Sequence, residues 1–200
     1  MLIDNSDEAL MRLFVNATRQ ADLMGPGLAE AHRNVGRQLA GAVAQKLIIE
    51  DVTINHVAGS SIGVQLKPGS EPIIVAVMRA GLFVAEGLWS SLPGSSLVLY
   101  SPGASLDSMP IRGRPVIIVD SVINTGRSIR EALDAVMPLQ PGSIVVAAVV
   151  AYRANLEVMV NEFPSVDFHV ARISDRSYVG RGSTDTGARL FGTTNWSCEA

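Results

Sequence analysis

The sequence has few cysteines and no long apolar segment, and each shortage excludes a class of protein. Cys198 is the only cysteine among 200 residues, which excludes an internal disulfide framework and a cysteine-rich metal site. The longest apolar run, Ile144–Tyr152, is far shorter than the roughly 18 residues of a membrane-spanning helix. No basic segment precedes an apolar one at the amino end, so we expect no secretory signal, no membrane association and a cytoplasmic location.

Basic residues are also fewer than acidic residues. The chain has 16 basic and 19 acidic residues, a net charge of −3, so we expect no general attraction to nucleic acid. Lys46 and Lys67 are the only lysines, and the other 14 basic residues are arginines. Guanidinium groups offer the paired donors that suit phosphates, although a GC-rich genome explains the same bias equally well.

Several common catalytic patterns are missing. His32, His56 and His169 lie far apart in the sequence and lack the spacing of metal ligands. The chain contains neither a Gly-x-Ser-x-Gly nucleophile elbow nor a Gly-x-x-x-x-Gly-Lys-Ser/Thr loop. Trp89 and Trp196 are interpreted as packing residues.

What the sequence does have is a high apolar content, 48%, arranged in short blocks. Residues 6–24 and 28–50 have apolar side chains at helical spacing, with a Pro26-Gly27 break between them. Apolar runs without alternation then predict buried strands, and helical segments separate several of them. The predicted strands are 73–78, 97–100, 116–119, 144–151 and 166–173, and the predicted helices between them are 83–91, 127–137 and 154–162.

This order of elements predicts an α/β fold with an open, doubly wound parallel sheet. We expect one domain over residues 1–200, with helices at 1–50, the sheet at 72–172 and an irregular tail at 173–200. The tail is rich in Gly, Ser and Thr, so it is either frayed or part of a site.

The end of the predicted strand 116–119 is the most informative candidate for a binding site. Asp120 ends this apolar run, and Asn124–Ser128 then open a helix. Ligands in such sheets bind beyond the carboxyl ends of the strands, and a Thr-Gly turn at a helix start can offer N–H groups to an anion. Asp120 would then accept hydrogen bonds from a sugar. As an alternative, Asp120 and Thr125 merely cap the helix.

The apolar run before Arg79 leads into a second tight turn, Arg79-Ala80-Gly81. Gly81 permits a tight backbone path, and Arg79 offers a delocalised cation for a diphosphate. An arginine at such a position is also often only a surface residue.

Three segments together resemble the uracil phosphoribosyltransferase family of type I phosphoribosyltransferases. The run VIIVDSVINTGRS is similar to the binding motif for phosphoribosyl pyrophosphate (PRPP), and the 74–82 segment to the pyrophosphate loop. The tail 178–193 is similar to the uracil-binding segment. It matches the family pattern at Tyr178, Gly182, Asp185, Gly187, Arg189, Phe191, Gly192 and Thr193.

The resemblance implies transfer of the 5-phosphoribosyl group from PRPP to uracil or a related pyrimidine, giving UMP and pyrophosphate. It implies catalytic roles for Arg79, Asp120 and Asp185. PRPP would be bound by Arg79, Ala80, Gly81, Asp120, Ser121, Asn124, Thr125, Gly126, Arg127 and Ser128, and the base by Tyr178, Val179, Gly182, Thr184, Asp185 and Thr186. Mg²⁺ would come with PRPP, with no direct protein ligand, although Asp185 could reach it through water. A homodimer or higher homo-oligomer is also implied.

The sequence departs from the family at two places. In the tail, Arg181 replaces a proline, Thr184 a glycine and Ala188 an aspartate. Arg181 could favour a more acidic or carboxylated ring, so the exact base stays open. The 100–115 connection is short and lacks the family's Tyr-Arg start, which leaves Arg112 and Arg114 as the charges expected nearby. A different heterocyclic acceptor and a non-catalytic PRPP- or nucleotide-binding regulator therefore remain alternatives.

Overall fold

A seven-stranded parallel sheet forms the centre of the computed structural model, which describes residues 1–178 and 180–195. Val179, Trp196 and Cys198 lie outside the described residues. The strand order is β1-β8-β7-β6-β4-β5, and β9 also pairs with β7. The strands are β1 (Leu2–Asp4), β4 (Ile73–Val77), β5 (Ser96–Tyr100), β6 (Pro115–Ile123), β7 (Ser143–Tyr152), β8 (Val166–Val170) and β9 (Ile173–Ser174). Every pairing in this sheet is parallel, so the predicted fold class is confirmed.

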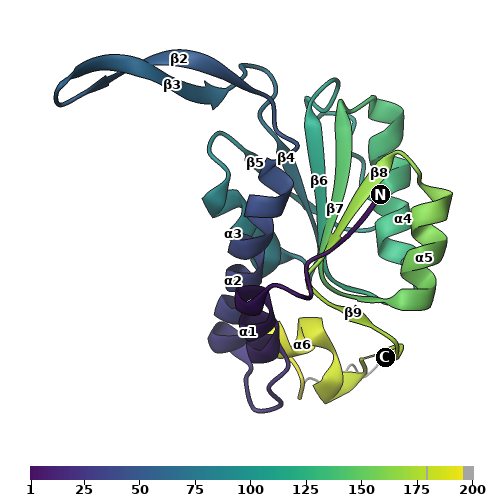
Figure 1. Ribbon diagram of the computed structural model, residues 1–200. Helices are drawn as coiled ribbons and strands as arrows, with labels where there is room; N and C mark the ends of the chain where they lie inside the picture. The colour runs from purple at the N-terminus through teal and green to yellow at the C-terminus, as the bar shows by residue number, and fades with distance from the viewer. Residues whose placement is uncertain (179, 196–200) are drawn as a thin grey trace.

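Helices cover both faces of this sheet (Figure 1). The helices α1 (Ala9–Thr18), α2 (Gly25–Ala44) and α3 (Leu82–Ser91) lie on one face. The helices α4 (Arg127–Val136) and α5 (Arg153–Glu162) lie on the other, and the short η1 (Met137–Leu139) follows α4. This two-sided cover explains why the strands are continuous apolar runs.

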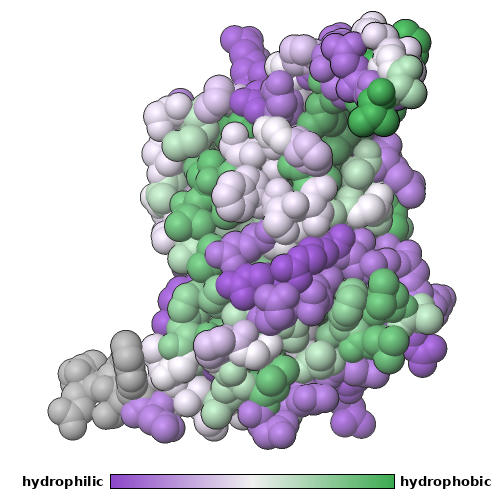
Figure 2. All heavy atoms as spheres, turned by 90° about the vertical axis from the view of Figure 1, so that its left-hand side faces the viewer, coloured by the Kyte–Doolittle hydropathy of each residue, from purple (hydrophilic) through white to green (hydrophobic). Residues whose placement is uncertain are grey.

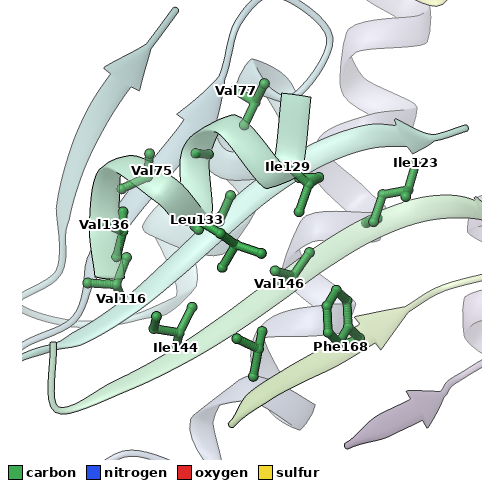
Figure 3. Packing of buried hydrophobic residues seen from close by; sticks show 14 of the residues in the cluster. Val75, Val77, Val116, Ile123, Ile129, Leu133, Val136, Ile144, Val146 and Phe168 are labelled. Atoms are coloured by element: carbon green, nitrogen blue, oxygen red, sulfur yellow. The ribbon is translucent and has the colours of Figure 1, made fainter. Parts of the chain in front are cut away.

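The alternation of side chains along a strand divides the core in two. Val75 and Val77 of β4 pack with Ile129 and Leu133 of α4, as Figure 3 shows. Ile74 and Ala76, which point the other way, belong to the cluster under α1–α3. Both faces of β4 are fully buried, which fixes the strand end that leads to Arg79.

Two glycines bring α2 and α3 into close contact. A Cβ on Gly36 would lie 2.1 Å from the Val84 carbonyl oxygen, and a Cβ on Gly87 would lie 2.1 Å from the Arg33 carbonyl oxygen. Neither position has room for a side chain. The helix pair is therefore packed backbone to backbone.

The amino-terminal quarter differs from the prediction of two helices over residues 6–50. It begins with the edge strand β1, and α2 ends at Ala44. An antiparallel hairpin follows, made of β2 (Ile49–His56) and β3 (Gly59–Leu66), which the sequence analysis did not predict. The hairpin extends away from the main sheet (Figure 1). Its exposed side chains include the apolar Ile54, Ile62 and Val64, and Figure 2 shows hydrophobic and hydrophilic groups side by side at the top of the molecule.

The short connection before β6 is packed into the core. Leu106 and Ile111 are buried there. Arg112 donates to the Gln140 side chain, and Arg114 donates to the Glu71 carbonyl oxygen. These contacts lie at the amino ends of the strands, so the expectation that both arginines offer charge near the site was wrong.

The carboxyl-terminal segment packs against the body of the protein. The short η2 (Gly182–Thr184) precedes α6 (Thr186–Phe191), which lies beyond the carboxyl ends of the strands (Figure 1). Leu190 packs on Leu28 and Ala29 of α2. Arg189 donates to the carbonyl oxygens of Gln20 and Leu23, 2.6 and 2.9 Å away. The described part of the tail is therefore ordered by contacts with the α1–α2 connection and α2.

The described residues include no helix with both the length and the apolar character needed to cross a membrane.

Candidate active site

A cavity of about 410 Å³ lies at the carboxyl ends of β4 and β6, and we call it the carboxylate cavity. Asp120 and Asp185 are its two acidic residues. Its walls come from the three segments that the sequence analysis selected. They are Val77, Met78, Arg79 and Ala80, then Asp120, Val122, Asn124 and Ser128, then Tyr178, Gly180, Asp185, Thr186 and Gly187. The fold thus brings together residues more than 100 positions apart in the chain.

Asp120 lies within β6, three residues before the strand ends at Ile123, rather than at its end. Its Oδ1 accepts a hydrogen bond of 2.7 Å from the Ser121 backbone N–H. Burial raises the pKa of Asp120 to about 7, because the N–H groups of Ser121 and Val122 stabilise the anion by less than desolvation costs. No ion pair with a residue of 1–178 or 180–195 compensates this carboxylate. The site is therefore suited to a ligand that brings hydroxyl donors or positive charge.

Arg79 enters the same cavity directly after β4. Its guanidinium lies 5.5 Å from the centre of the Phe191 ring, and that ring packs on Phe83 at 5.3 Å. Helix α6 thus supports the arginine from one side. Among the described residues, no hydrogen bond or ion pair occupies its donors, which leaves them available to an anionic ligand.

Only some residues of the loop after β6 line the cavity. Asn124 and Ser128 line the cavity, whereas Thr125, Gly126 and Arg127 are absent from its walls. Gly126 has φ of 75°, and a Cβ there would lie 2.2 Å from the Met159 sulfur, so this turn requires glycine. The side chain of Arg127 is exposed and pairs with Glu131 at 2.8 Å. Phosphate binding by this loop stays a prediction that depends on backbone N–H groups at the start of α4.

Hydrogen bonds fold the tail over the site. The Tyr178 hydroxyl donates to the Thr184 carbonyl oxygen. Asp185 caps α6, because its Oδ1 accepts from the Ala188 N–H at 2.7 Å. Gly182 and Thr184, which were predicted to bind the base, line neither this cavity nor its neighbour. Gly81 also lies outside the walls, and a Cβ there would be 2.3 Å from the Val119 carbonyl oxygen, so this turn packs directly on β6.

A second cavity of about 410 Å³ adjoins the first, and we call it the arginine cavity. The two cavities share Val122, Asn124, Tyr178 and Thr186. The arginine cavity is lined further by His32, Ser121, Tyr152 and Ser174, and by Arg19, Arg172, Arg176 and Arg189. Sequence reasoning gave none of these four arginines a binding role, although Arg189 was among the residues that match the family pattern of the tail.

His32 is the buried centre of a small polar network. Its Nδ1 lies 2.9 Å from the Leu28 carbonyl oxygen, and its Nε2 lies 2.9 Å from the Ser121 Oγ. Burial is the main cause that lowers the pKa of His32 to about 4, and the charge of Arg189 acts in the same direction. In the neutral ring, Nδ1–H donates to Leu28 and the Ser121 hydroxyl donates to Nε2.

The structure separates Ser121 from Asp120. We expected Ser121 to bind PRPP beside Asp120, which stays a prediction, and Ser121 lines the arginine cavity and not the carboxylate cavity. Adjacent residues of a strand point to opposite faces, which explains the separation. The sequence analysis considered His32 only as a metal ligand. The position of His32 in the sequence, one helical turn after Leu28, does not indicate that its second partner, Ser121, lies 89 residues away.

Within the part of the chain that the structure describes, no three His, Cys, Asp or Glu side chains gather closely enough to hold a metal ion. Asp120 and Asp185 are the carboxylates nearest to a ligand in the carboxylate cavity. A metal there would need most of its ligands from a bound substrate.

The parallel sheet, the two loops at its carboxyl edge and the segment over them define a type I phosphoribosyltransferase. The structure of the AQ2163 protein from Aquifex aeolicus has the same fold, with a TM-score of 0.81, 20% identity and coverage of 98% of this chain and 100% of that one. A hypoxanthine-guanine phosphoribosyltransferase from Bacillus anthracis is similar at a TM-score of 0.52 and 13% identity, over 81% of this chain and 88% of its own.

The sequence comparisons identify the family. The uracil phosphoribosyltransferase family model matches residues 5–193, so the chain belongs to this family. Uracil phosphoribosyltransferase from Staphylococcus epidermidis is 30% identical over 174 residues, which cover 80% of this chain and 83% of that protein. The enzyme from Staphylococcus carnosus is 26% identical over 202 aligned positions, covering 94% and 96%. The resemblance inferred from three motifs is confirmed.

Proposed function

We propose that the protein transfers the 5-phosphoribosyl group of PRPP to a ring nitrogen of uracil or a related pyrimidine. A bond forms between that nitrogen and C1′ of the ribose, the bond from C1′ to the diphosphate oxygen breaks, and the nitrogen loses its proton to solvent. The products are UMP and pyrophosphate. One observation carries the proposal: the carboxylate cavity is lined at once by Arg79, by the Asp120–Ser128 loop and by the tail.

The donor is held by the two loops at the strand ends. The 5-phosphate binds at the start of α4, next to Asn124 and Ser128, where helix N–H groups favour an anion. Asp120 accepts hydrogen bonds from the ribose hydroxyls. Arg79 and the N–H group of Ala80 bind the diphosphate, whose charge increases as the bond to C1′ breaks. The Gly81 N–H instead donates to the Val77 carbonyl oxygen at 2.9 Å and shapes the turn.

The base lies on the side of the tail. Tyr178 and Thr186 line both cavities, so they mark the boundary between sugar and acceptor. Gly182 and Thr184 line neither cavity. In this proposal they shape the tail, because the Asp185 N–H donates to the Gly182 carbonyl oxygen and the Tyr178 hydroxyl donates to the Thr184 carbonyl oxygen. Asp185 orients the segment through its cap of α6. Catalysis then depends mainly on positioning and on electrostatic stabilisation of an oxocarbenium-like ribose.

Mg²⁺ would be bound together with PRPP. The described residues offer only the separate carboxylates of Asp120 and Asp185 near the carboxylate cavity, so most ligands of the ion would come from the substrate. A bound Mg²⁺ ion would supply positive charge to the diphosphate.

The protein acts in the cytoplasm as a homodimer in this proposal. The β2–β3 hairpin exposes Ile54, Ile62 and Val64, which a second copy of the chain would cover. Sedimentation of the protein and of an Ile54→Ser/Ile62→Ser variant tests this. A protein that sediments as a monomer contradicts it.

The activity is tested by incubating the protein with PRPP, Mg²⁺ and uracil and measuring UMP and pyrophosphate. Arg79→Gln should lower kcat/KM by about 10- to 100-fold, because a charge-assisted contact to the diphosphate is lost. Arg112→Gln, at the opposite end of the sheet, is the matched control and should leave it unchanged. Calorimetric binding of PRPP with no product from any pyrimidine or purine would reject the transferase and favour a regulator.

A further inference from the structure

The arginine cavity concentrates positive charge in a protein with an overall negative charge. Four arginines line it, and no Asp or Glu belongs to its described walls. Arg172 is partly buried, and its pKa is lowered first by burial and then by the nearby charge of Arg19. Two guanidinium groups thus face one cavity without a carboxylate between them. An anion bound there would remove their mutual repulsion.

Most arginines outside this cavity form ion pairs with carboxylates, whereas the arginines that line it form none within the described part of the chain. Six arginines outside it form ion pairs with Asp or Glu side chains, namely Arg33, Arg37, Arg114, Arg127, Arg130 and Arg153. Among the described residues, the guanidinium groups of Arg19, Arg172 and Arg176 have neither an ion pair nor a hydrogen bond. Arg189 gives one nitrogen to two backbone carbonyls. Three arginines whose guanidinium groups have no ion pair or hydrogen bond among the described residues therefore line this one cavity, in addition to Arg79 in the adjoining carboxylate cavity.

This cavity continues the acceptor side of the site. The two cavities meet at Val122, Asn124, Tyr178 and Thr186. Asn124 also has a buried side-chain oxygen without a hydrogen-bond partner in the described chain. With about 410 Å³ the arginine cavity alone falls in the range of roughly 300–1,000 Å³ that suits ligands much larger than one pyrimidine ring. A base placed at the boundary leaves most of this space for a substituent.

We propose that the arginine cavity binds an anionic substituent of the acceptor, so that the protein prefers a pyrimidine carrying a carboxylate over the unsubstituted base. The inference rests on the proposed function and names the acceptor class of the same site. Guanidinium groups form paired, charge-assisted hydrogen bonds with carboxylates. Arg172 is the central contact, because it is the least exposed of the three unpaired arginines.

The test compares bases that differ in charge but little in shape. With PRPP and Mg²⁺ held constant, kcat/KM is measured for uracil, for uracil-5-carboxylate and uracil-6-carboxylate, and for the matching neutral carboxamides. At least one carboxylate should exceed its carboxamide by about tenfold or more. Arg172→Gln should reduce that ratio by about tenfold, whereas Arg112→Gln should leave it unchanged. Carboxylates no better than their carboxamides, or a ratio unaffected by Arg172→Gln, would overturn the inference.

A binding measurement separates this inference from the proposed function. UMP and its 5- and 6-carboxylated counterparts are titrated into the protein by calorimetry, which needs no turnover. Tighter binding of a carboxylated nucleotide that Arg172→Gln abolishes supports the inference even if no base is converted. Conversion of uracil together with equal binding of all three nucleotides refutes the inference and leaves the transferase intact.

Discussion

Replacement of Asp120 by asparagine should stabilise the fold at neutral pH while it removes activity. The carboxyl is buried, and its pKa rises from the ordinary 3.8 to about 7 in the folded protein. Asparagine has almost the same shape and can still accept the Ser121 N–H through its oxygen. It carries no charge to desolvate. Asp120→Asn therefore removes the free-energy cost of desolvating a carboxylate, which the folded state has and the unfolded chain does not.

The pH dependence follows from the direction of the pKa shift. Because the folded protein holds this proton more tightly than the unfolded chain, stability from the protonated carboxyl is fully present below about pH 4 and is lost as pH rises through 7. A shift of this size corresponds to about 4 kcal/mol at pH 8 and to less than about 1 kcal/mol at pH 4. For a domain of this length, about 4 kcal/mol raises Tm by roughly 10 °C.

Thermal unfolding of wild type and Asp120→Asn between pH 4 and pH 9 measures this difference. The exposed Asp134 on α4 provides the control, and Asp134→Asn should change the free energy of unfolding by less than about 0.5 kcal/mol throughout. Activity with PRPP and uracil should fall about 10- to 100-fold in Asp120→Asn, since a charged acceptor for the ribose hydroxyls is lost. A variant that is less stable than wild type at pH 8, or equally stabilised at pH 4 and pH 8, would refute the reasoning.

The central sheet and the donor loops could be predicted from sequence because local patterns encode them. The strands β4, β6 and β7 are continuous apolar runs, and burial on both faces demands such composition. Once the strands are parallel, their carboxyl ends lie on one edge, which brings Arg79 and Asp120 together. The same rule explains the error at Arg114. A residue directly before a strand lies at the amino edge, where Arg114 contacts Glu71.

The arginine cavity could not be predicted in this way. Arg19 follows α1, Arg172 follows β8 and Arg189 lies in α6, so the packing of α6 on α2 is what brings them together. The role of His32 could not be predicted either, because its partners are Leu28, one turn earlier in the same helix, and Ser121, on a strand distant in sequence. The hairpin was missed for another reason: its strands expose apolar side chains, so neither a buried run nor a clean alternation marks them.

The packing of α2 supports two further predictions. Gly36→Ala should lower the free energy of unfolding by about 1–3 kcal/mol, because its Cβ would overlap the Val84 carbonyl, whereas Gly41→Ala on the open side of the same helix should be neutral or stabilising in a urea titration. His32→Phe and Ser121→Ala should each cost about 1–3 kcal/mol, since each leaves a buried polar partner unsatisfied. In the double variant the hydroxyl and the ring that bond to one another are both gone, so the combined cost should be at least about 1 kcal/mol smaller than the sum of the single costs. Additive costs in the same urea titration would mean that the two side chains do not bond in solution, and that Ser121 is free to turn toward a ligand.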